Sequence, residues 1–422
     1  MRNALVCAVA ALGVSAGLAQ AGELTVAHPW TGADGADVSA LFELFEQRTG
    51  HRVRHVGSDS FEQQIRVDTA AGSAPNVAAF PQPGLAASLA AQGYLTPLAE
   101  GTADWIRENY ASGEVWADLG TYADETGAQK LFGFMFKADL KSLVWYVPEN
   151  FEEAGYAVPQ SLEELKALTE QIVADGGTPW CFGIGSEAAT GWPATDWVED
   201  MMLRTQSPAD YDAWVSNEMK FTDPKVIAAI EEFGWFVRKD AFMLGGARGV
   251  ASTDVRDSPK GLFSLPPACF MHRQGSFVPS FFPQGTVVGE DVDFFYFPAY
   301  AGKDFGKPVL GAGTFWAIPN ASPEAHELIE FFKSVEAHEF WMGRRNFLTP
   351  HKGVDPQAFA DPSLRKMNDI LLSATTFRFD GSDLMPGAIG TGAFWTGMVE
   401  YVGGASAEAV AAQIQARWDA LQ

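Results

Sequence analysis

The most conspicuous feature of this sequence is a set of tryptophan residues in turn-rich segments, where they could bind a ligand. The chain has 13 Trp, and six of them lie beside Gly, Pro and Asp rather than at the spacing of a core helix or strand. An indole face packs against the C–H face of a pyranose ring and buries apolar area, so these residues predict a carbohydrate ligand. About half of them are expected to fill cores instead, because Trp is highly buried on average. The six are Trp30, Trp180, Trp192, Trp197, Trp316 and Trp395.

Polar residues that can bind sugar hydroxyl groups lie close to these aromatic residues in the sequence. Taken singly, such a residue is more often a solvated surface group than a ligand contact, but their clustering favours a binding site. These neighbours are His28, Asp59, Gln82, Lys137, Glu187, Thr190 and Asp196.

Short catalytic motifs are missing from the sequence. It has no G-x-S-x-G, H-E-x-x-H, G-x-x-x-x-G-K-[ST] or paired C-x-x-C, and its seven His occur singly, without the spacing of a zinc site. We therefore expect no enzyme activity, no cofactor and no metal. A secreted glycoside hydrolase is the alternative from another class, because some pair among 53 acidic residues could flank a glycosidic bond at about 5 to 9.5 Å.

A negatively charged sugar is a second alternative. Lys137, His272 and Arg273 could neutralise a carboxylate or sulfonate on the ligand, although ion pairs within this acidic chain explain the basic residues more simply. Aromatic cages also bind quaternary ammonium groups. The residues alone leave these choices open.

The charge and the first residues indicate an exported protein. A net charge of -24, from 29 basic and 53 acidic residues, excludes nucleic acids and anionic membrane surfaces as partners. Arg2, the apolar stretch 4–18 and the small residues Ala19 and Ala21 form a secretory signal, cleaved after Ala21. We find no later apolar segment of membrane-spanning length and expect a soluble mature protein of about two domains.

Two cysteines remain after the signal, which contains Cys7. Export permits a disulfide between Cys181 and Cys269. Two unpaired buried thiols are the alternative.

The apolar spacing predicts alternating strands and helices. Strands are expected at 23–28, 51–56 and 76–80, with helices between them, the first after a Gly/Asp turn and ending at Gly50. Further helices are expected to start at Ser161, Asp223 and Ser322. The Gly-rich segments 246–249 and 311–316 are interpreted as turns or hinges. The pattern indicates α/β lobes joined by binding loops.

Four segments, at 131–168, 178–204, 266–278 and 379–395, resemble extracellular solute-binding proteins of sugar ABC importers. The resemblance is to the maltose-binding-like family, in its α-glucoside-binding branch, and covers essentially the whole mature chain. It implies an α/β, two-lobed type II binding-protein fold with a cleft between discontinuous lobes. The implied N-terminal lobe is 22–136 plus 312–347, the C-terminal lobe is 137–311 plus 348–422, and hinge crossings fall near 134–137, 308–311 and 348–350.

The resemblance also implies a periplasmic, monomeric protein that closes on a sugar and delivers it to a membrane permease. Maltodextrin-binding relatives have aromatic residues where this chain has small residues at 186–190 and polar residues at 272–274, so a mono- or disaccharide α-glucoside is expected. By motif position, the implied ligand contacts are Trp30, Asp59, Gln82, Lys137, Glu187, Thr190, Trp192, Arg273, Gln274, Gly313, Trp316, Asp383, Met385 and Trp395.

Overall fold

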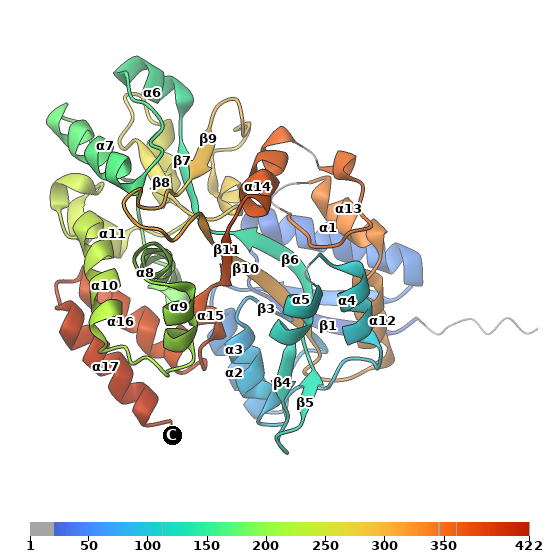
Figure 1. Cartoon of the computed structure of the whole chain (residues 1–422). Coiled ribbons are helices and arrows are strands. Elements are labelled where there is room, and N and C mark those ends of the chain that lie inside the picture. Colours follow the sequence, from blue (N-terminus) through green and yellow to red (C-terminus); the bar gives the residue numbers. More distant parts are fainter. Residues whose placement is uncertain (1–20, 112, 345–346, 360, 422) are drawn as a thin grey trace, which may run out of the picture.

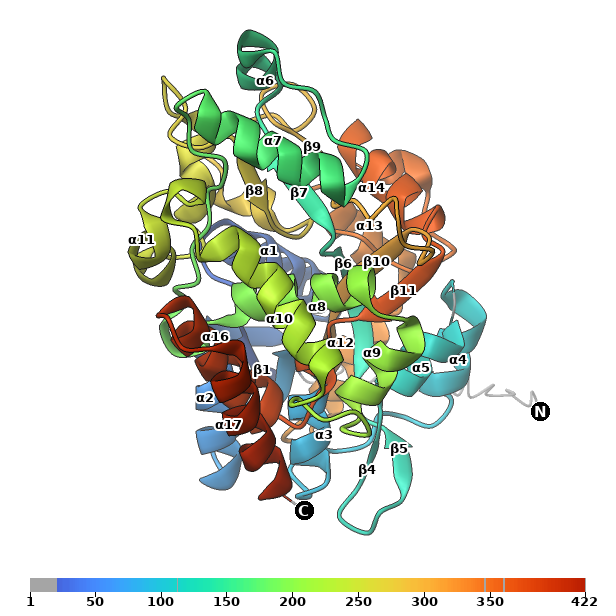
Figure 2. The ribbon, with the colours of Figure 1, turned by 60° about the vertical axis from the view of Figure 1, so that its left-hand side comes forward.

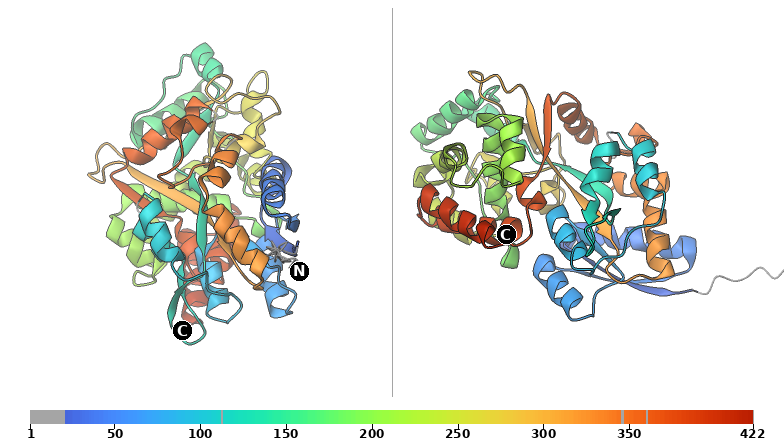
Figure 3. Two further views of the ribbon diagram at one scale, coloured as in Figure 1. Left: turned by 90° about the vertical axis from the view of Figure 1, so that its right-hand side faces the viewer. Right: turned by 60° about the horizontal axis from the view of Figure 1, so that its bottom comes forward.

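Two α/β lobes face each other across a cleft in the computed structural model (Figure 1). It describes residues 21–421 apart from 112, 345–346 and 360. The expected signal segment up to residue 20 lies outside the described residues. Figure 3 shows the lobes from two further directions, with the C-terminal helices on one lobe and the N-terminal strands on the other.

The N-terminal lobe is built on a six-stranded sheet with the order β11-β10-β3-β1-β2, in which β6 also pairs with β10. β1 runs parallel to both β2 and β3, which confirms the expected β-α-β-α-β start. The six strands are β1 (Glu23–His28), β2 (Arg52–Gly57), β3 (Val77–Phe80), β6 (Phe134–Leu140), β10 (Pro308–Ala317) and β11 (Thr376–Phe379). A separate hairpin joins β4 (Thr121–Ala123) to β5 (Gln129–Leu131).

The helices of this lobe cover the sheet. The first helix begins at Gly32, so the Gly/Asp segment expected to be a turn is its first turn, where Asp34 complements the positive end of the helix dipole. Gly50 ends this helix with φ 79°, a left-handed conformation that glycine adopts without strain. The helices are α1 (Gly32–Thr49), α2 (Phe61–Ala70), α3 (Pro83–Ala90), α4 (Thr102–Asn109), α5 (Gly113–Leu119), α12 (Pro323–Phe332) and α13 (Val335–Met342).

The C-terminal lobe has a smaller, antiparallel sheet and a larger set of helices. The sheet has the order β8-β7-β9, with β7 (Leu143–Tyr146), β8 (Met271–Arg273) and β9 (Asp293–Tyr296). Trp197, Phe233 and Phe236 pack in its core. The helices are α6 (Pro148–Ala154), α7 (Leu162–Ala174), α8 (Trp192–Thr205), α9 (Pro208–Val215), α10 (Pro224–Val237), α11 (Gly246–Ser252), α15 (Gly381–Leu384), α16 (Trp395–Val402) and α17 (Ala407–Asp419).

One further helix and six short helical segments complete the described part of the chain. They are α14 (Pro362–Leu372), η1 (Glu187–Ala189), η2 (Asp240–Phe242), η3 (Ser258–Phe263), η4 (Val278–Phe281), η5 (Pro356–Ala358) and η6 (Ile389–Phe394).

The predicted helix starts are confirmed. The side chains of Ser161, Asp223 and Ser322 each accept a hydrogen bond from a backbone N–H of the first turn, which satisfies donors that a helix leaves free. The two Gly-rich segments are not simple turns. The segment 246–249 starts α11, and 311–316 is the interior of β10, where small residues allow close pairing with β6.

The lobes are joined by β6 and β10, which run antiparallel with an irregularity between Thr314 and Phe315. Both strands continue through the expected lobe boundaries at 136/137 and 311/312 without a break. The chain enters the smaller sheet only at Leu143. The boundary positions therefore stay a prediction, inside strands that the two lobes share.

A disulfide joins Cys181 to Cys269, with the Cα atoms 5.4 Å apart, an ordinary separation for such a bond. The pairing predicted from the sequence is confirmed. It ties the segment leading into η1 and α8 to the segment leading into β8.

Among the helices of the described part of the chain, none combines the length and apolar character needed to cross a membrane.

Candidate ligand-binding cleft

A cavity of about 180 Å³ lies between the lobes and is lined by residues of both. Trp30, Asp59 and Gln82 follow β1, β2 and β3, and because these strands are parallel, their carboxyl ends meet at one edge of the sheet. Lys137 and Gly313 of the crossing strands also line the cavity. The facing wall comes from the first turns of α8, α15 and α16 and from η4.

Three tryptophans line the cavity, and their neighbours hold the rings in place. Trp30 packs edge-on against Trp341 at 5.4 Å and lies 5.7 Å from Trp316. Trp192 lies 5.9 Å from Phe277. Fixed indole faces on both lobes suit the flat apolar face of a pyranose.

Gly191 brings two of these tryptophans together. Its φ is 114°, and a Cβ at this position would lie 2.3 Å from the carbonyl oxygen of Trp395. Glycine therefore allows the start of α8, with Trp192, to approach the start of α16, with Trp395. The indole N–H of Trp395 is buried and has no hydrogen-bond partner among the described residues.

Carboxyl groups outnumber basic groups on the cavity wall. Each lining cation is already paired: Lys137 with Asp139, Lys141 with Asp196 and Asp380, and Arg256 with Asp59. The lining acids are Asp34, Asp59, Glu62, Asp139, Asp196 and Asp383, and the lining cations are Lys137, Lys141 and Arg256.

Burial disfavours the charged form of several of these acids. It raises the pKa of Asp34 to about 6 and raises the pKa values of Glu62 and Asp383, because a dry site disfavours charge. The lining carboxyl groups accept hydrogen bonds, and the ammonium groups of Lys137 and Lys141 donate them. The cavity can therefore pair with hydroxyl groups, which themselves donate and accept.

Lys141 anchors the C-terminal wall of the cavity. Its ammonium lies 2.9 Å from Asp196 of α8 and also binds Asp380, the N-cap of α15. Its Nζ lies 5.5 Å from the ring centre of Trp192. Burial acts against the charged form of Asp380, but Lys141 and hydrogen bonds lower its pKa to about 2. One buried cation thus holds the starts of two cavity-lining helices together.

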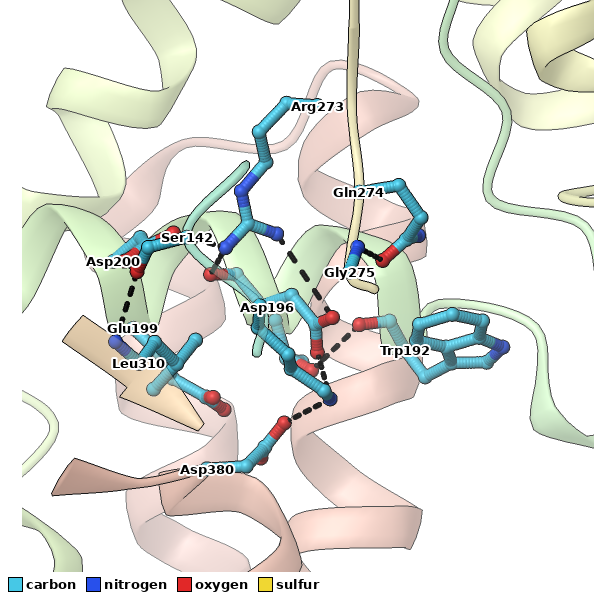
Figure 4. A network of polar contacts seen from close by, with 12 residues as sticks. Ser142, Trp192, Asp196, Glu199, Asp200, Arg273, Gln274, Gly275, Leu310 and Asp380 are labelled. Carbon is cyan, nitrogen blue, oxygen red and sulfur yellow. Dashed lines mark hydrogen bonds and ion pairs between the residues drawn. The ribbon is translucent and has the colours of Figure 1, made fainter. Parts of the chain in front are cut away.

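A second buried network lies behind this wall (Figure 4). Arg273 of β8 and Arg204 of α8 both bind Asp200, and Ser142 donates to Asp200 at 2.7 Å. The Ser142 hydroxyl in turn accepts from the backbone N–H of Leu310 at 2.8 Å. These contacts fasten α8 to the crossing strand β10.

His272 is buried beside Arg273 and stays neutral. Burial lowers its pKa to about 4, and its Nδ1 lies 2.9 Å from the carbonyl oxygen of Cys181. It therefore carries no positive charge at neutral pH and does not neutralise an anionic ligand.

A pH prediction follows for the variant His272→Gln. The unfolded chain binds a proton at this residue at about pH 6.5, whereas the folded protein binds it only near pH 4, so this group's contribution to stability falls as the pH falls between those values. The free energy of unfolding of the wild type minus that of the variant should fall by about 3 kcal/mol from pH 7 to pH 4. Urea unfolding at each pH measures it, and a constant or rising difference contradicts the prediction.

The cavity contains eight of the fourteen residues implied by the resemblance. They are Trp30, Asp59, Gln82, Lys137, Trp192, Gly313, Asp383 and Trp395. Their contact with a ligand stays a prediction.

The other six lie outside the cavity lining, for identifiable reasons. Trp316 and Met385 are buried in hydrophobic cores, and Arg273 binds Asp200 behind the wall. The side chain of Gln274 is buried and accepts from the N–H of Gly275. In the η1 turn, Glu187 accepts from Ser60 at 3.1 Å and Thr190 donates to the carbonyl oxygen of Glu187.

Several lining residues were not predicted from the sequence. The segment that contains Asp34 was expected to be a turn. Arg256 belongs to no recognisable sequence motif. Lys141 lies in an apolar strand region, four residues after Lys137. A lysine is rarely buried unless it is paired, so its position there could have predicted an internal ion pair. The polar and aromatic residues missed are Thr31, Asp34, Glu62, Asp139, Lys141, Ser186, Arg256, Phe277, Phe281, Thr314 and Ser382.

Three buried carboxylates, Asp196, Glu199 and Asp380, lie close enough together to hold a metal ion. The ammonium of Lys141 binds two of them, so the positive charge in this cluster comes from the protein itself. The donor set therefore fits an internal ion pair better than a cation site.

A cleft between two α/β lobes, lined from both sides, is the architecture of a protein that binds a solute by closing on it. The chain belongs to the bacterial extracellular solute-binding protein family, which matches residues 29–339.

Two curated relatives align with nearly the whole chain. One is 58% identical over 400 residues, or 94% of this chain and 87% of the relative, and is the alpha-glucosides-binding periplasmic protein AglE of Rhizobium meliloti (strain 1021). The other is 40% identical over 397 residues, or 94% of this chain and 92% of the relative, and is the osmoprotective compounds-binding protein GgtB of Synechocystis sp. (strain ATCC 27184 / PCC 6803 / Kazusa).

Solved structures share the fold. The bacterial solute receptor AcbH has a TM-score of 0.81 at 18% identity, over 95% of this chain and 99% of that one. The maltose-bound MalE3 of T. maritima has a TM-score of 0.73 at 15% identity, over 95% and 100%. The two-lobed binding-protein fold expected from the sequence is thereby confirmed.

Proposed function

We propose that this protein captures a small, neutral α-glucoside between its lobes and delivers it to the permease of an ABC importer. The observation that carries the proposal is the cavity itself, with Trp30 on one lobe and Trp192 and Trp395 on the other. The relative named for binding alpha-glucosides, 58% identical over 400 residues, supports the choice of solute.

Charge favours a neutral ligand over an anionic one. Six acids face three cations, each already paired, so an added carboxylate or sulfonate would find no free cation and would lie among further carboxyl groups. Arg273 lies behind the wall and His272 is neutral. Two of the three basic residues that suggested an anionic sugar are therefore engaged elsewhere, and Lys137 binds Asp139.

Size favours a short ligand. A volume of about 180 Å³ has room for about a dozen groups the size of a water molecule, which is close to one hexose with its hydroxyl groups. Lobe movement and displaced side chains can admit a second ring. The space therefore favours a mono- or disaccharide over a long oligosaccharide.

Location and partners follow from the same proposal. Export through the N-terminal signal, with cleavage after Ala21, would place the protein in the periplasm, where the closed monomer would meet its permease. Closure would be stabilised because the sugar contacts one lobe in the open form and both in the closed form. We propose no catalysis, cofactor, resident metal or nucleic-acid partner.

A thermal-shift screen of the mature protein tests the function. The panel is trehalose, sucrose, maltose and palatinose, with two anionic ligands, a glucuronide and a sulfonated sugar, and the zwitterion betaine as alternatives. A ligand that binds only the folded state raises its melting temperature by mass action, and we expect this from one neutral α-glucoside. Stabilisation by an anionic sugar or betaine alone would refute the proposed solute class, and turnover of a chromogenic α-glucoside would support the hydrolase alternative.

The substitution Trp395→Ala tests the aromatic wall. Loss of an aromatic anchor and of its free indole N–H should weaken binding by about 1 to 3 kcal/mol, measured by calorimetric titration. Trp235→Ala is the matched control, because Trp235 stacks with Lys166 and Lys239 and none of the three lines the cavity. Equal affinities for Trp395→Ala and the wild type would remove Trp395 from the site.

A further inference from the structure

One side of the cavity is spanned by an ion pair between the lobes. Asp59 lies between β2 and α2 of the N-terminal lobe, and Arg256 follows α11 of the C-terminal lobe. Both residues line the cavity. Their side chains are also 19% and 32% exposed, so the pair separates the cavity from solvent.

Each member of the pair is held by its own lobe. The Thr31 hydroxyl donates to Asp59 at 3.1 Å. The guanidinium of Arg256 lies 5.7 Å from the ring centre of Phe281, another cavity-lining residue. The pair is therefore a positioned part of the wall rather than a chance meeting of two mobile surface groups.

Further contacts between the lobes lie beside this pair, along α2. The Ser60 hydroxyl donates to Glu187 at 3.1 Å, and Glu187 has φ 46°, a left-handed conformation that costs energy in a residue other than glycine. Farther along α2, Arg66 donates to Thr391 of η6 at 2.9 Å. Figure 2 shows α2 beneath the end of the C-terminal lobe that carries α16.

We infer that the Asp59–Arg256 pair is a gate that limits the length of the ligand. The inference rests on the proposed function and adds to it the class of solute, a glycoside that ends inside the cavity. A chain extended by one more sugar on this side would have to occupy the position of the guanidinium. It would then leave Asp59 without its cation in a cavity that already has surplus acid, and it would hold the lobes apart.

The gate makes a prediction about gain of binding. The pair forms only when the lobes meet. A ligand that ends inside the cavity lets the lobes meet and is stabilised by the contacts between them, whereas a ligand that protrudes past the pair prevents these contacts. Replacing Arg256 by Ala opens the wall, and Asp59 keeps its hydrogen bond from Thr31 and its partly exposed side. The variant should accept ligands that the wild type rejects.

The test is a calorimetric titration of the mature protein. The ligands are two pairs that differ by one sugar, maltose with maltotriose and sucrose with raffinose, together with trehalose. The wild type should bind a disaccharide about tenfold or more tightly than its extended partner. In Arg256→Ala and in Asp59→Ala this ratio should fall to about threefold or less, through gain of trisaccharide binding. Arg248→Ala, an exposed change in α11 of the same lobe, should keep the wild-type ratio.

Two outcomes overturn the gate. One is a wild type that binds both lengths equally. The other is an unchanged ratio in Arg256→Ala, and if both affinities fall equally there, Arg256 is a ligand contact instead. The wild-type titrations separate failure of the gate from failure of the proposed function. If the proposed function is wrong, the wild type will bind no neutral α-glucoside at all.

Discussion

Replacing Lys141 with Met should lower the free energy of unfolding by about 3 to 5 kcal/mol at pH 7. The substitution keeps a long side chain but removes the cation shared by Asp196 and Asp380. It leaves buried Asp380 without a counter-charge and Asp196 with only Arg273, at 3.9 Å. Urea unfolding measures the loss. Sugar affinity should fall with it, because Asp380 caps the helix that carries Asp383 into the cavity.

The pH dependence identifies the cause of this loss. Without Lys141, burial raises the pKa of Asp380 above the value of about 3.9 in the unfolded chain, so the folded variant binds protons first and recovers stability as the pH falls from 8 to 5. Lys260→Met is the control, because Lys260 is exposed and paired with exposed Asp257, a contact worth about 1 kcal/mol or less. A loss in Lys141→Met no larger than in this control would contradict the role of the buried cation.

Removing the disulfide by a Cys181→Ala and Cys269→Ala double substitution should lower the free energy of unfolding by about 4 kcal/mol. The bond closes a loop with a sequence separation of 88, and opening it increases the freedom of the unfolded chain. Urea unfolding in the absence of reductant measures the difference.

Reductant supplies the matched control for this prediction. Dithiothreitol should destabilise the wild type by a similar amount and leave the double variant unchanged. If the wild type without reductant is no more stable than the double variant, the bond contributes nothing and the prediction is wrong.

The early strands and the helix starts were predictable because their signals are local. Alternating apolar residues mark β1, and Ser161, Asp223 and Ser322 satisfy free helix N–H groups within one turn. The segment 311–316 shows where local reasoning fails. Its glycines suggest a turn, but a Cβ at Gly313 would lie 2.2 Å from Met135, so glycine serves close pairing of two distant strands.

The site was only partly predictable, for a related reason. Trp192 and Trp316 have similar sequence surroundings, but only tertiary packing decides that Trp192 lines the cavity while Trp316 is fully buried. Lys141 and Arg256 act through partners more than fifty residues away. Residues that pair over such long sequence distances show no spacing pattern in a single sequence. Aromatic residues near turns can be recognised from their neighbours in the sequence.

The most direct test of the central claim is a calorimetric titration of the mature protein with the neutral α-glucoside that stabilises it in the screen, repeated with an analogue in which one hydroxymethyl group is oxidised to a carboxylate. The account predicts saturable 1:1 binding of the neutral sugar and at least about tenfold weaker binding of the acidic analogue. Equal or tighter binding of the acidic analogue would contradict a cavity whose surplus of carboxyl groups selects neutral sugars.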